Sequence, residues 1–197
     1  MFSPPDLLKD KILREAPTCR GWGPWDRSLV FANSEVKAIK LKNGTMPIPP
    51  RSVAVQPTFD MDVAIGWQSC IAGKVNVRAK VVRADPGSPD GVSWTIIHAG
   101  QIEQKVLAQG TLDRVESISI PAAADADTLA AITVQKGDGL CLLIDSRELS
   151  QCESTTVVDL VITEAGASGR TWDLAKDVAA DIQAGNGLLL SASCPCM

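Results

Sequence analysis

The chain has 197 residues, of which 45% are hydrophobic and 21% are charged, an ordinary composition for a globular protein with a buried core. Its 19 Lys and Arg against 23 Asp and Glu give a net charge of −4, which argues against a general nucleic-acid binder because phosphate contacts need an excess of cations. No apolar run reaches the roughly 20 residues of a membrane-spanning helix, and a single histidine, His98, excludes a site built from several imidazoles.

The N-terminal residues and the cysteines leave the cellular compartment open. The stretch from Met1 to Asp6 lacks the basic region and the apolar core of a secretory signal. We therefore expect either a cytoplasmic protein or a fragment whose signal lies upstream. The six cysteines are few for a disulfide scaffold and match no zinc motif. Cys141 and Cys152 flank a predicted hairpin and are the candidate disulfide.

Residues 1–29 are predicted to form a helix and a linker that precede the main domain. In residues 6–16 the apolar side chains fall on one helical face, Asp6 can cap the helix and Pro17 can end it. A turn rich in Gly and Pro follows and contains Trp22 and Trp25. Such a turn is typical of a linker that docks onto a domain.

Residues 30–164 are predicted to form an all-β domain, an antiparallel β-sandwich. The clearest strand is Lys74–Val81, where apolar side chains occupy every odd position, as in a strand with one wet and one buried face. Turn residues separate the segments, and no helical pattern lies between them, which favours a jelly roll; an immunoglobulin-like sandwich is the alternative. The other predicted strands are Val36–Leu41, Arg51–Val55, Asp62–Trp67, Val92–Ile97, Glu103–Leu107, Val115–Ile120, Ala131–Val134, Leu140–Ile144 and Thr156–Ile162.

Residues 165–197 are predicted to form an irregular C-terminal extension. Gly166–Gly169 reads as a flexible joint, and Trp172, Leu174 and Val178 are placed to anchor the next segment on the sandwich. The residues from Gly187 onward follow neither the helical nor the strand period.

The sequence contains no recognisable catalytic motif. There is no G-x-S-x-G motif, and His98 ends an apolar run, where a solvent-facing position is expected. We therefore predict no catalytic residues and no enzyme. The alternative is a glycoside hydrolase or lyase with two carboxylates on one face. The acids on or beside predicted strands are Asp60, Asp62, Asp145, Asp159 and Glu164.

The loop from Asp85 to Asp90 is a candidate calcium site. It offers two carboxylates, a serine and backbone carbonyls, which are the oxygen ligands that calcium prefers. Its spacing is not that of an EF-hand, and the same residues are typical of a plain turn. Structural calcium is the cofactor that the sequence leaves open, whereas the C-x-x-C-H haem motif is absent from it.

The aromatic residues favour a binding function. Five tryptophans occur with three phenylalanines and no tyrosine, and sandwich domains that bind sugars use exposed aromatic rings as stacking platforms. Trp22, Trp25 and Trp94 are the candidate stacking residues. Trp67 and Trp94 lie within predicted strands, where a core position is the alternative.

Several motifs, taken in their order and spacing, resemble one module of planctomycete proteins. They begin with Pro50–Pro57 and Val63–Ser69 and continue with Gly73–Val75, Asp90–Trp94, Gly137–Asp138, Asp145–Arg147, Cys152–Leu160 and Arg170–Ala175. Residues 30–185 are thereby similar to the C-terminal β-sandwich module of planctomycete-type cytochrome c domain-containing proteins, a family of unknown function.

The resemblance implies a β-sandwich similar to carbohydrate-binding modules, in an extracytoplasmic location and without established catalytic residues. We therefore expect a non-catalytic accessory module of a larger assembly, which binds polysaccharide or docks onto another domain or chain. A third interpretation is a purely structural domain that packs on a cytochrome-bearing partner, and it predicts a large exposed apolar patch.

Overall fold

The computed structural model describes residues 6–7, 10–13, 16–23, 28–42, 44–85, 91–100, 102–113, 117–122, 126–147, 155–166, 169–184 and 190–192. These residues form β1 (Asp6–Leu7), β2 (Lys11–Leu13), β3 (Cys19–Trp22), β4 (Leu29–Asn33), β5 (Ile39–Leu41), β6 (Met46–Ile48), β7 (Ser52–Gln56), β8 (Val63–Gln68), β9 (Gly73–Arg83), β10 (Val92–Ala99), β11 (Gln104–Leu112), β12 (Ser117–Ile120), β13 (Ile132–Val134), β14 (Gly139–Ser146), β15 (Thr156–Glu164), β16 (Thr171–Asp173), α1 (Leu174–Asp177) and β17 (Leu190–Ala192).

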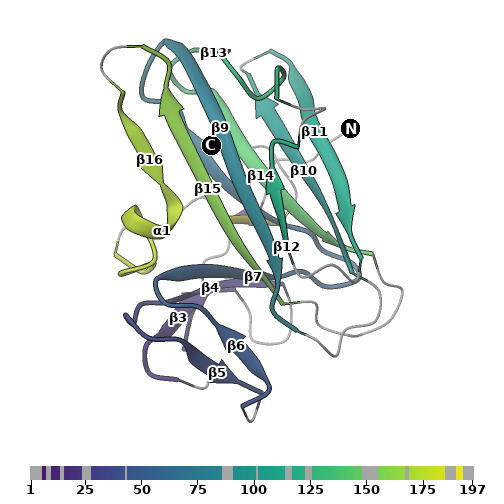
Figure 1. Cartoon of the computed structure of the whole chain (residues 1–197), viewed down its shortest axis with the longest axis vertical. Helices are drawn as coiled ribbons and strands as arrows, with labels where there is room; N and C mark the ends of the chain where they lie inside the picture. Colours follow the sequence, from purple (N-terminus) through teal and green to yellow (C-terminus); the bar gives the residue numbers. More distant parts are fainter. Residues whose placement is uncertain are drawn as a thin grey trace.

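Eight of these strands form a jelly roll (Figure 1). One four-stranded set has the order β8-β14-β10-β11 and the other has the order β7-β15-β9-β12, with all neighbours antiparallel. The chain crosses between the sets after β7, β8, β9, β11, β12 and β14, which gives the two Greek keys of a jelly roll. The fold class predicted from the sequence is therefore confirmed.

Short strands widen both sheets. β4, β3 and β2 continue one sheet beyond β7, and β17 and β1 continue the other beyond β8. β13 pairs with β9, β16 pairs with β15, and β5 and β6 form a separate hairpin at one end of the molecule (Figure 1). Part of the predicted N-terminal linker is thus a sheet strand, because Cys19–Trp22 pairs with Leu29–Asn33.

The N-terminal helix predicted for residues 6–16 is a point that the structure corrects. The described residues there form β1 and β2, and Lys11–Leu13 pairs in register with β3. Intrinsic helix preferences amount to less than about 1 kcal/mol per residue, so hydrogen bonds to an available sheet edge outweigh them. The helix of the described residues is α1, and none of them forms a helix long and apolar enough to span a membrane.

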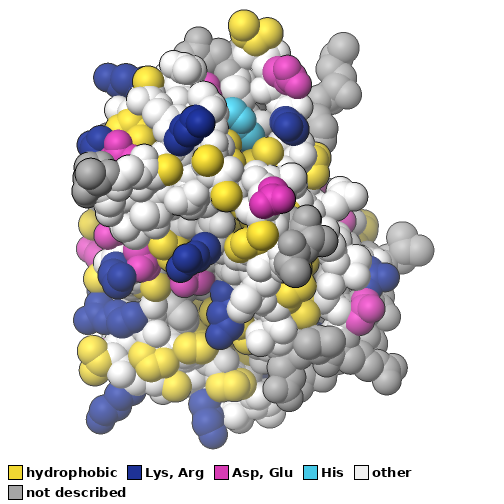
Figure 2. All heavy atoms as spheres, turned by 45° about the horizontal axis from the view of Figure 1, so that its top comes forward, with side chains coloured by type: hydrophobic (Ala, Val, Ile, Leu, Met, Phe, Trp, Pro, Cys, Tyr) yellow, Lys and Arg dark blue, Asp and Glu magenta, His cyan; other side chains and the backbone are white. Residues whose placement is uncertain are grey.

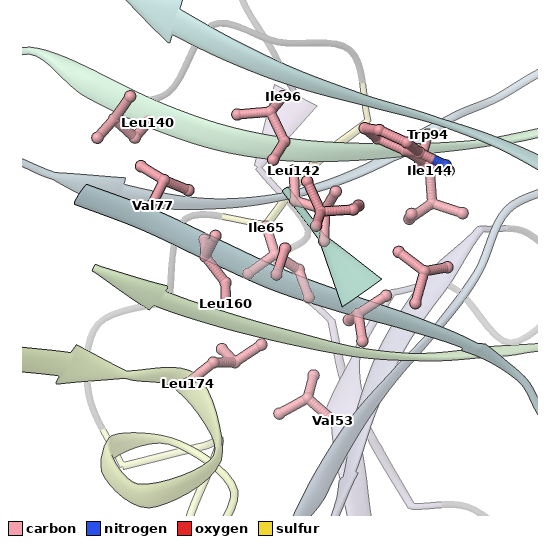
Figure 3. Packing of buried hydrophobic residues seen from close by; sticks show 14 of the residues in the cluster. Val53, Ile65, Val77, Trp94, Ile96, Leu140, Leu142, Ile144, Leu160 and Leu174 are labelled. Atoms are coloured by element: carbon pink, nitrogen blue, oxygen red, sulfur yellow. The ribbon is translucent and has the colours of Figure 1, made fainter. Parts of the chain in front are cut away.

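The core lies between the two sheets (Figure 3). Ile96 of β10 and Leu142 of β14 project from one sheet toward Val77 of β9 and Leu160 of β15 on the other. Trp94 belongs to the same cluster and is only 3% exposed. Full burial of each such side chain stabilises the fold by about 1.5–3 kcal/mol relative to an exposed position.

Residues 169–184 fold back onto β15 at one edge of the sandwich, where Figure 1 shows β16 and α1. Trp172 pairs with Ile162 across the two strands. As predicted, Trp172, Leu174 and Val178 pack against the core. Asp173 caps α1 by accepting a hydrogen bond from the Lys176 backbone N–H at 3.1 Å. This capped segment forms one wall of the cleft described next.

Candidate functional site

A cleft opens between the two sheets where β8 faces β15, β16 and α1. It encloses about 350 Å³, near the lower end of the roughly 300–1,000 Å³ that small-molecule sites span. Most of its walls are aliphatic or aromatic, with polar side chains at the rim. We call it the indole cleft, and its lining residues are Ile65, Gly66, Trp67, Gln68, Leu160, Ile162, Trp172, Asp173, Leu174, Asp177 and Val178.

The cleft lies at the C-terminal end of β8. Among the described residues, β17 pairs with Ala64 and Ile65 of β8. Gly66–Gln68 extends past this pairing and lies at the cleft. Trp67 lies at the end of β8, where it pairs with Leu140 of β14 and packs against the edge of the core.

Two half-buried tryptophans are the main feature of the cleft. The ring centroids of Trp67 and Trp172 are 4.8 Å apart, with planes tilted by 49°, a favourable geometry for an aromatic pair. The guanidinium of Arg170 lies 5.9 Å from the centre of the Trp172 ring. Glu164 holds that guanidinium with hydrogen bonds of 2.8 and 3.4 Å. The two indoles are therefore positioned before any ligand binds.

The polar rim of the cleft is mainly acidic. Both oxygens of Asp173 are engaged by Lys176, Oδ1 by the backbone N–H and Oδ2 by the Nζ atom at 2.7 Å. Burial pushes the pKa of Asp173 up, but the hydrogen bonds and charge of Lys176 outweigh it and lower the pKa overall. Asp177 Oδ2 accepts the Asp173 backbone N–H at 2.8 Å. Gln68 supplies an amide on the opposite side of the cleft.

Asp159 of β15 lies close to the same acidic group. Burial raises the pKa of Asp159, and the charge of Asp173 raises it further. Backbone N–H groups of Leu160 and Ala175 and the charge of Lys176 offset part of this rise. The Oδ1 atom of Asp159 is buried and accepts no hydrogen bond. The raised pKa favours the neutral form of Asp159 beside the charged Asp173.

Of the tryptophans that the sequence singled out for stacking, the two described ones, Trp22 and Trp94, do not line this cleft. Trp94 is 3% exposed and Trp22 is 5% exposed, so neither presents a ring face to solvent. Trp22 donates its indole N–H to the Ile182 carbonyl at 2.8 Å. The core positions of these two rings correct the expectation that they stack on a ligand. Trp25 lies outside the described residues.

The candidate calcium loop is described only at its first residue. Asp85 is 9% exposed and forms an ion pair with Lys42 at 2.6 Å. Asp90 lies outside the described residues, so calcium binding there stays a prediction. Within the described ranges, no group of three or more His, Cys, Asp or Glu side chains is arranged to hold a metal ion.

The structure brings two of the candidate acids together. Asp62 precedes β8 and Asp145 lies in the neighbouring strand β14, which places both carboxyl groups within hydrogen-bonding distance. Burial, the hydrogen bond to Asp145 and its charge raise the pKa of Asp62 to about 7. Ser93 donates to the Asp145 Oδ2 atom at 3.1 Å. Asp60 lies apart on an exposed turn.

His98 lies in a second, wider groove at the end of the sandwich. The groove encloses about 770 Å³ and is bordered by both charged and polar side chains. His98 is not solvent-facing as expected, because its side chain is 19% exposed and its Nε2 atom lies 3.1 Å from Asp138 Oδ2. That oxygen also accepts the Gln135 backbone N–H at 2.9 Å. Figure 2 shows this imidazole in cyan on a face where charges of both signs lie nearby.

The described cysteines are in three different states. Cys141 is disulfide-bonded, whereas Cys19 is buried and Cys70 exposed, and neither of these two forms a disulfide. Cys152 lies outside the described residues, so its pairing with Cys141 stays a prediction.

Sequence reasoning placed Trp67 in a strand and Trp172 against the sandwich, but it did not join them into one site. The signal that was available is the position of Trp67 at the end of an alternating segment, followed by Gln68 and a turn. A large aromatic side chain at the end of a strand is a candidate for partial exposure at the edge of the core.

Comparison of the chain with models of known protein families, with curated proteins and with solved structures gives no match. The planctomycete resemblance therefore stays an expectation, and the interpretation of the site depends on its geometry and chemistry.

Proposed function

We propose that this chain is a non-catalytic accessory module that binds carbohydrate in the indole cleft. The observation that carries the proposal is the preformed pair of Trp67 and Trp172 at the mouth of a cleft between two sheets. Ligand sites typically combine apolar and aromatic walls with a few convergent polar groups. This cleft has that composition, and the jelly roll is an architecture that lectin domains also use.

The apolar C–H faces and the polar hydroxyl groups of a sugar ring match the apolar walls and the polar rim of the cleft. The C–H faces of a pyranose are apolar and pack against indole rings and aliphatic side chains. Its hydroxyl groups need hydrogen-bond acceptors and donors, which Asp177 and Gln68 offer at the rim. A sugar that enters with one ring face toward the tryptophans therefore leaves few hydroxyls without a partner.

The paired carboxyl groups of Asp62 and Asp145 do not favour the hydrolase alternative. Glycosidase carboxyl groups stand about 5–5.5 Å apart in retaining enzymes and about 6.5–9.5 Å apart in inverting ones. Asp62 and Asp145 are hydrogen-bonded, so they are too close for either arrangement. In the indole cleft itself, both oxygens of Asp173 are occupied by Lys176.

The aliphatic walls favour a second candidate function, docking of a partner domain or chain. Ile65, Ile162 and Leu174 line the inner part of the cleft, and an apolar side chain of a partner would bury against them without losing hydrogen bonds. In this case the cleft would hold a side chain in place of a sugar. The two functions predict different occupants of the cleft, a sugar ring in the first case and an apolar side chain of a partner in the second.

Titration of the purified chain with a panel of soluble polysaccharides, followed by calorimetry, tests the proposal. We expect one glycan class to bind, and Trp172→Ala to weaken it by about 30-fold or more, because a buried aromatic anchor typically contributes at least about 2 kcal/mol. Phe59→Ala is the matched control, since Phe59 is 58% exposed and does not line the cleft.

Two results would overturn carbohydrate binding in the indole cleft. One is the absence of heat with every glycan while an apolar dye such as anilinonaphthalene sulfonate binds the wild type and not Trp172→Ala, which would support docking. The other is equal glycan affinity in wild type and Trp172→Ala, which would show that the glycan binds outside the cleft.

A further inference from the structure

Among the described residues, the cations beside the indole cleft are all used in ion pairs with carboxylates. Two cations lie beside it, and each is already held by a carboxylate: Arg170 by Glu164 at 2.8 Å and Lys176 by Asp173 at 2.7 Å. The side chain of Lys176 is 79% exposed, so it extends into solvent from the pair with Asp173. These two ion pairs contribute no net charge to the cleft.

Asp177 is the carboxylate that remains. One of its oxygens accepts the Asp173 backbone N–H at 2.8 Å, which leaves the other oxygen available at the rim. Lys176 senses the charge of Asp177, but its Nζ atom lies on Asp173. Asp177 lines the cleft directly, so its uncompensated charge faces whatever enters.

Asp159 lies behind the same wall without lining the cleft, and burial and the charge of Asp173 raise its pKa, which favours its neutral form. Its Oδ1 atom is buried without a hydrogen-bond donor, and Asp173 lies near enough for their charges to interact. Its partner across the sheet is Lys80, which pairs with Asp159 in register on β9. Among the described lining residues, Asp177 is therefore the charged group at the α1 side of the cleft that has no ion-pair partner.

We infer that the ligand of the indole cleft is a glycan that carries free amino groups. A protonated amino group would sit beside Asp177 while the sugar ring packs on the indoles. Glycans with carboxylate or sulfate groups would be repelled by the same field. This inference rests on the proposed carbohydrate-binding function and names its substrate class by charge complementarity.

Three oligosaccharides of equal length test the inference by calorimetry at about pH 6, where amino groups are charged. They are a glucosamine oligomer, its N-acetylated counterpart and an oligogalacturonate. We expect the amino form to bind about fivefold more tightly than the acetylated form, a size typical of a partly exposed ion pair. The preference should fall at high ionic strength because salt screens exposed charges.

Asp177→Asn is the decisive variant. The amide oxygen of asparagine can still accept the Asp173 N–H, so the wall should keep its shape while the charge is removed. We expect the variant to lose the preference for the amino form and to retain affinity for the acetylated one. Asp127→Asn is the matched control, since it removes one exposed carboxylate that does not line the cleft.

The outcomes separate the inference from the function on which it rests. Equal or tighter binding of the acetylated or acidic oligosaccharide, or an unchanged preference in Asp177→Asn, would overturn the inference while carbohydrate binding stands. Failure of all three oligosaccharides and of the wider glycan panel would overturn both.

Discussion

The indole cleft and the His98 groove show that the larger hollow is not the better candidate site. The groove encloses about 770 Å³ against about 350 Å³ for the cleft. Charged and polar side chains make up a larger share of its walls than of the cleft's, and its histidine is already hydrogen-bonded to Asp138. Water solvates such a surface well, so a ligand gains little by displacing it. The cleft instead leaves two half-buried indoles partly exposed beside aliphatic walls, and a ligand that covers the indoles is favoured.

The His98 groove also lacks the partners that a catalytic histidine needs. Among the described residues, the hydrogen bond of His98 is to Asp138, and no hydroxyl or thiol group bonds to its ring. A carboxylate that orients an imidazole is one part of a nucleophilic site. Among the described residues, the pair forms a polar contact at this end of the sandwich.

The largest effect should come from the tryptophan that belongs to neither hollow. Trp94→Ala is expected to lower the free energy of unfolding by about 3–5 kcal/mol, because the ring is fully buried and its removal leaves a cavity. Urea unfolding measures this loss. The ring also packs on Gly110, where an added Cβ atom would lie 2.7 Å from the indole. A loss below about 1 kcal/mol would show that the core is less tightly packed than described.

Asp138→Ala should have a smaller effect, and on stability alone. The substitution leaves the Gln135 N–H without an acceptor and His98 without its partner, which costs about 1–3 kcal/mol for a buried polar group. Glycan affinity should stay within about twofold of the wild type, since Asp138 does not line the indole cleft. A large loss of affinity in this variant would reverse the comparison between the two hollows.

An effect that depends on pH concerns the shared proton of Asp62 and Asp145. The folded protein holds the pKa of Asp62 at about 7 against 3.8 for the ordinary carboxyl. The folded state thus binds a proton that the unfolded chain releases. The stabilisation is complete below pH 3.8 and is lost as the pH rises through about 7. Asp62→Asn should therefore become more stable relative to the wild type as the pH rises.

Urea unfolding at several pH values between about 5 and 8 checks this direction. Asp60→Asn is the control, because it removes a neighbouring carboxylate that lies on an exposed turn. If the difference between Asp62→Asn and the wild type were the same at every pH, the carboxyl groups would not share a proton.

The strands were predictable where one face is wet. In β9, Val75, Val77, Ala79 and Val81 are buried and alternate with polar side chains, so the period of two was visible in the sequence. In β4 all five residues are buried, and such a strand carries no alternation to detect. The N-terminal helix was mispredicted because the sequence does not show that a sheet edge is available to residues 11–13.

The site could not be read from the sequence for a related reason. Which tryptophans face an opening depends on how segments distant in the sequence pack together, and Trp67 borders the cleft at the end of β8. Trp172 meets it from a strand more than a hundred residues later in the chain. Trp22 looked exposed in a Gly-rich turn, yet β3 carries it into the sheet and its N–H binds Ile182.

The most direct test of the central claim is fluorine NMR of the chain with all five tryptophans replaced by 5-fluorotryptophan. Single Trp→Phe variants assign the resonances. On titration with a bound glycan, we predict that the Trp67 and Trp172 signals shift together and that the Trp22 and Trp94 signals stay in place. Shifts confined to the Trp22, Trp25 or Trp94 signals, with Trp67 and Trp172 unchanged, would contradict the assignment of the indole cleft as the carbohydrate site.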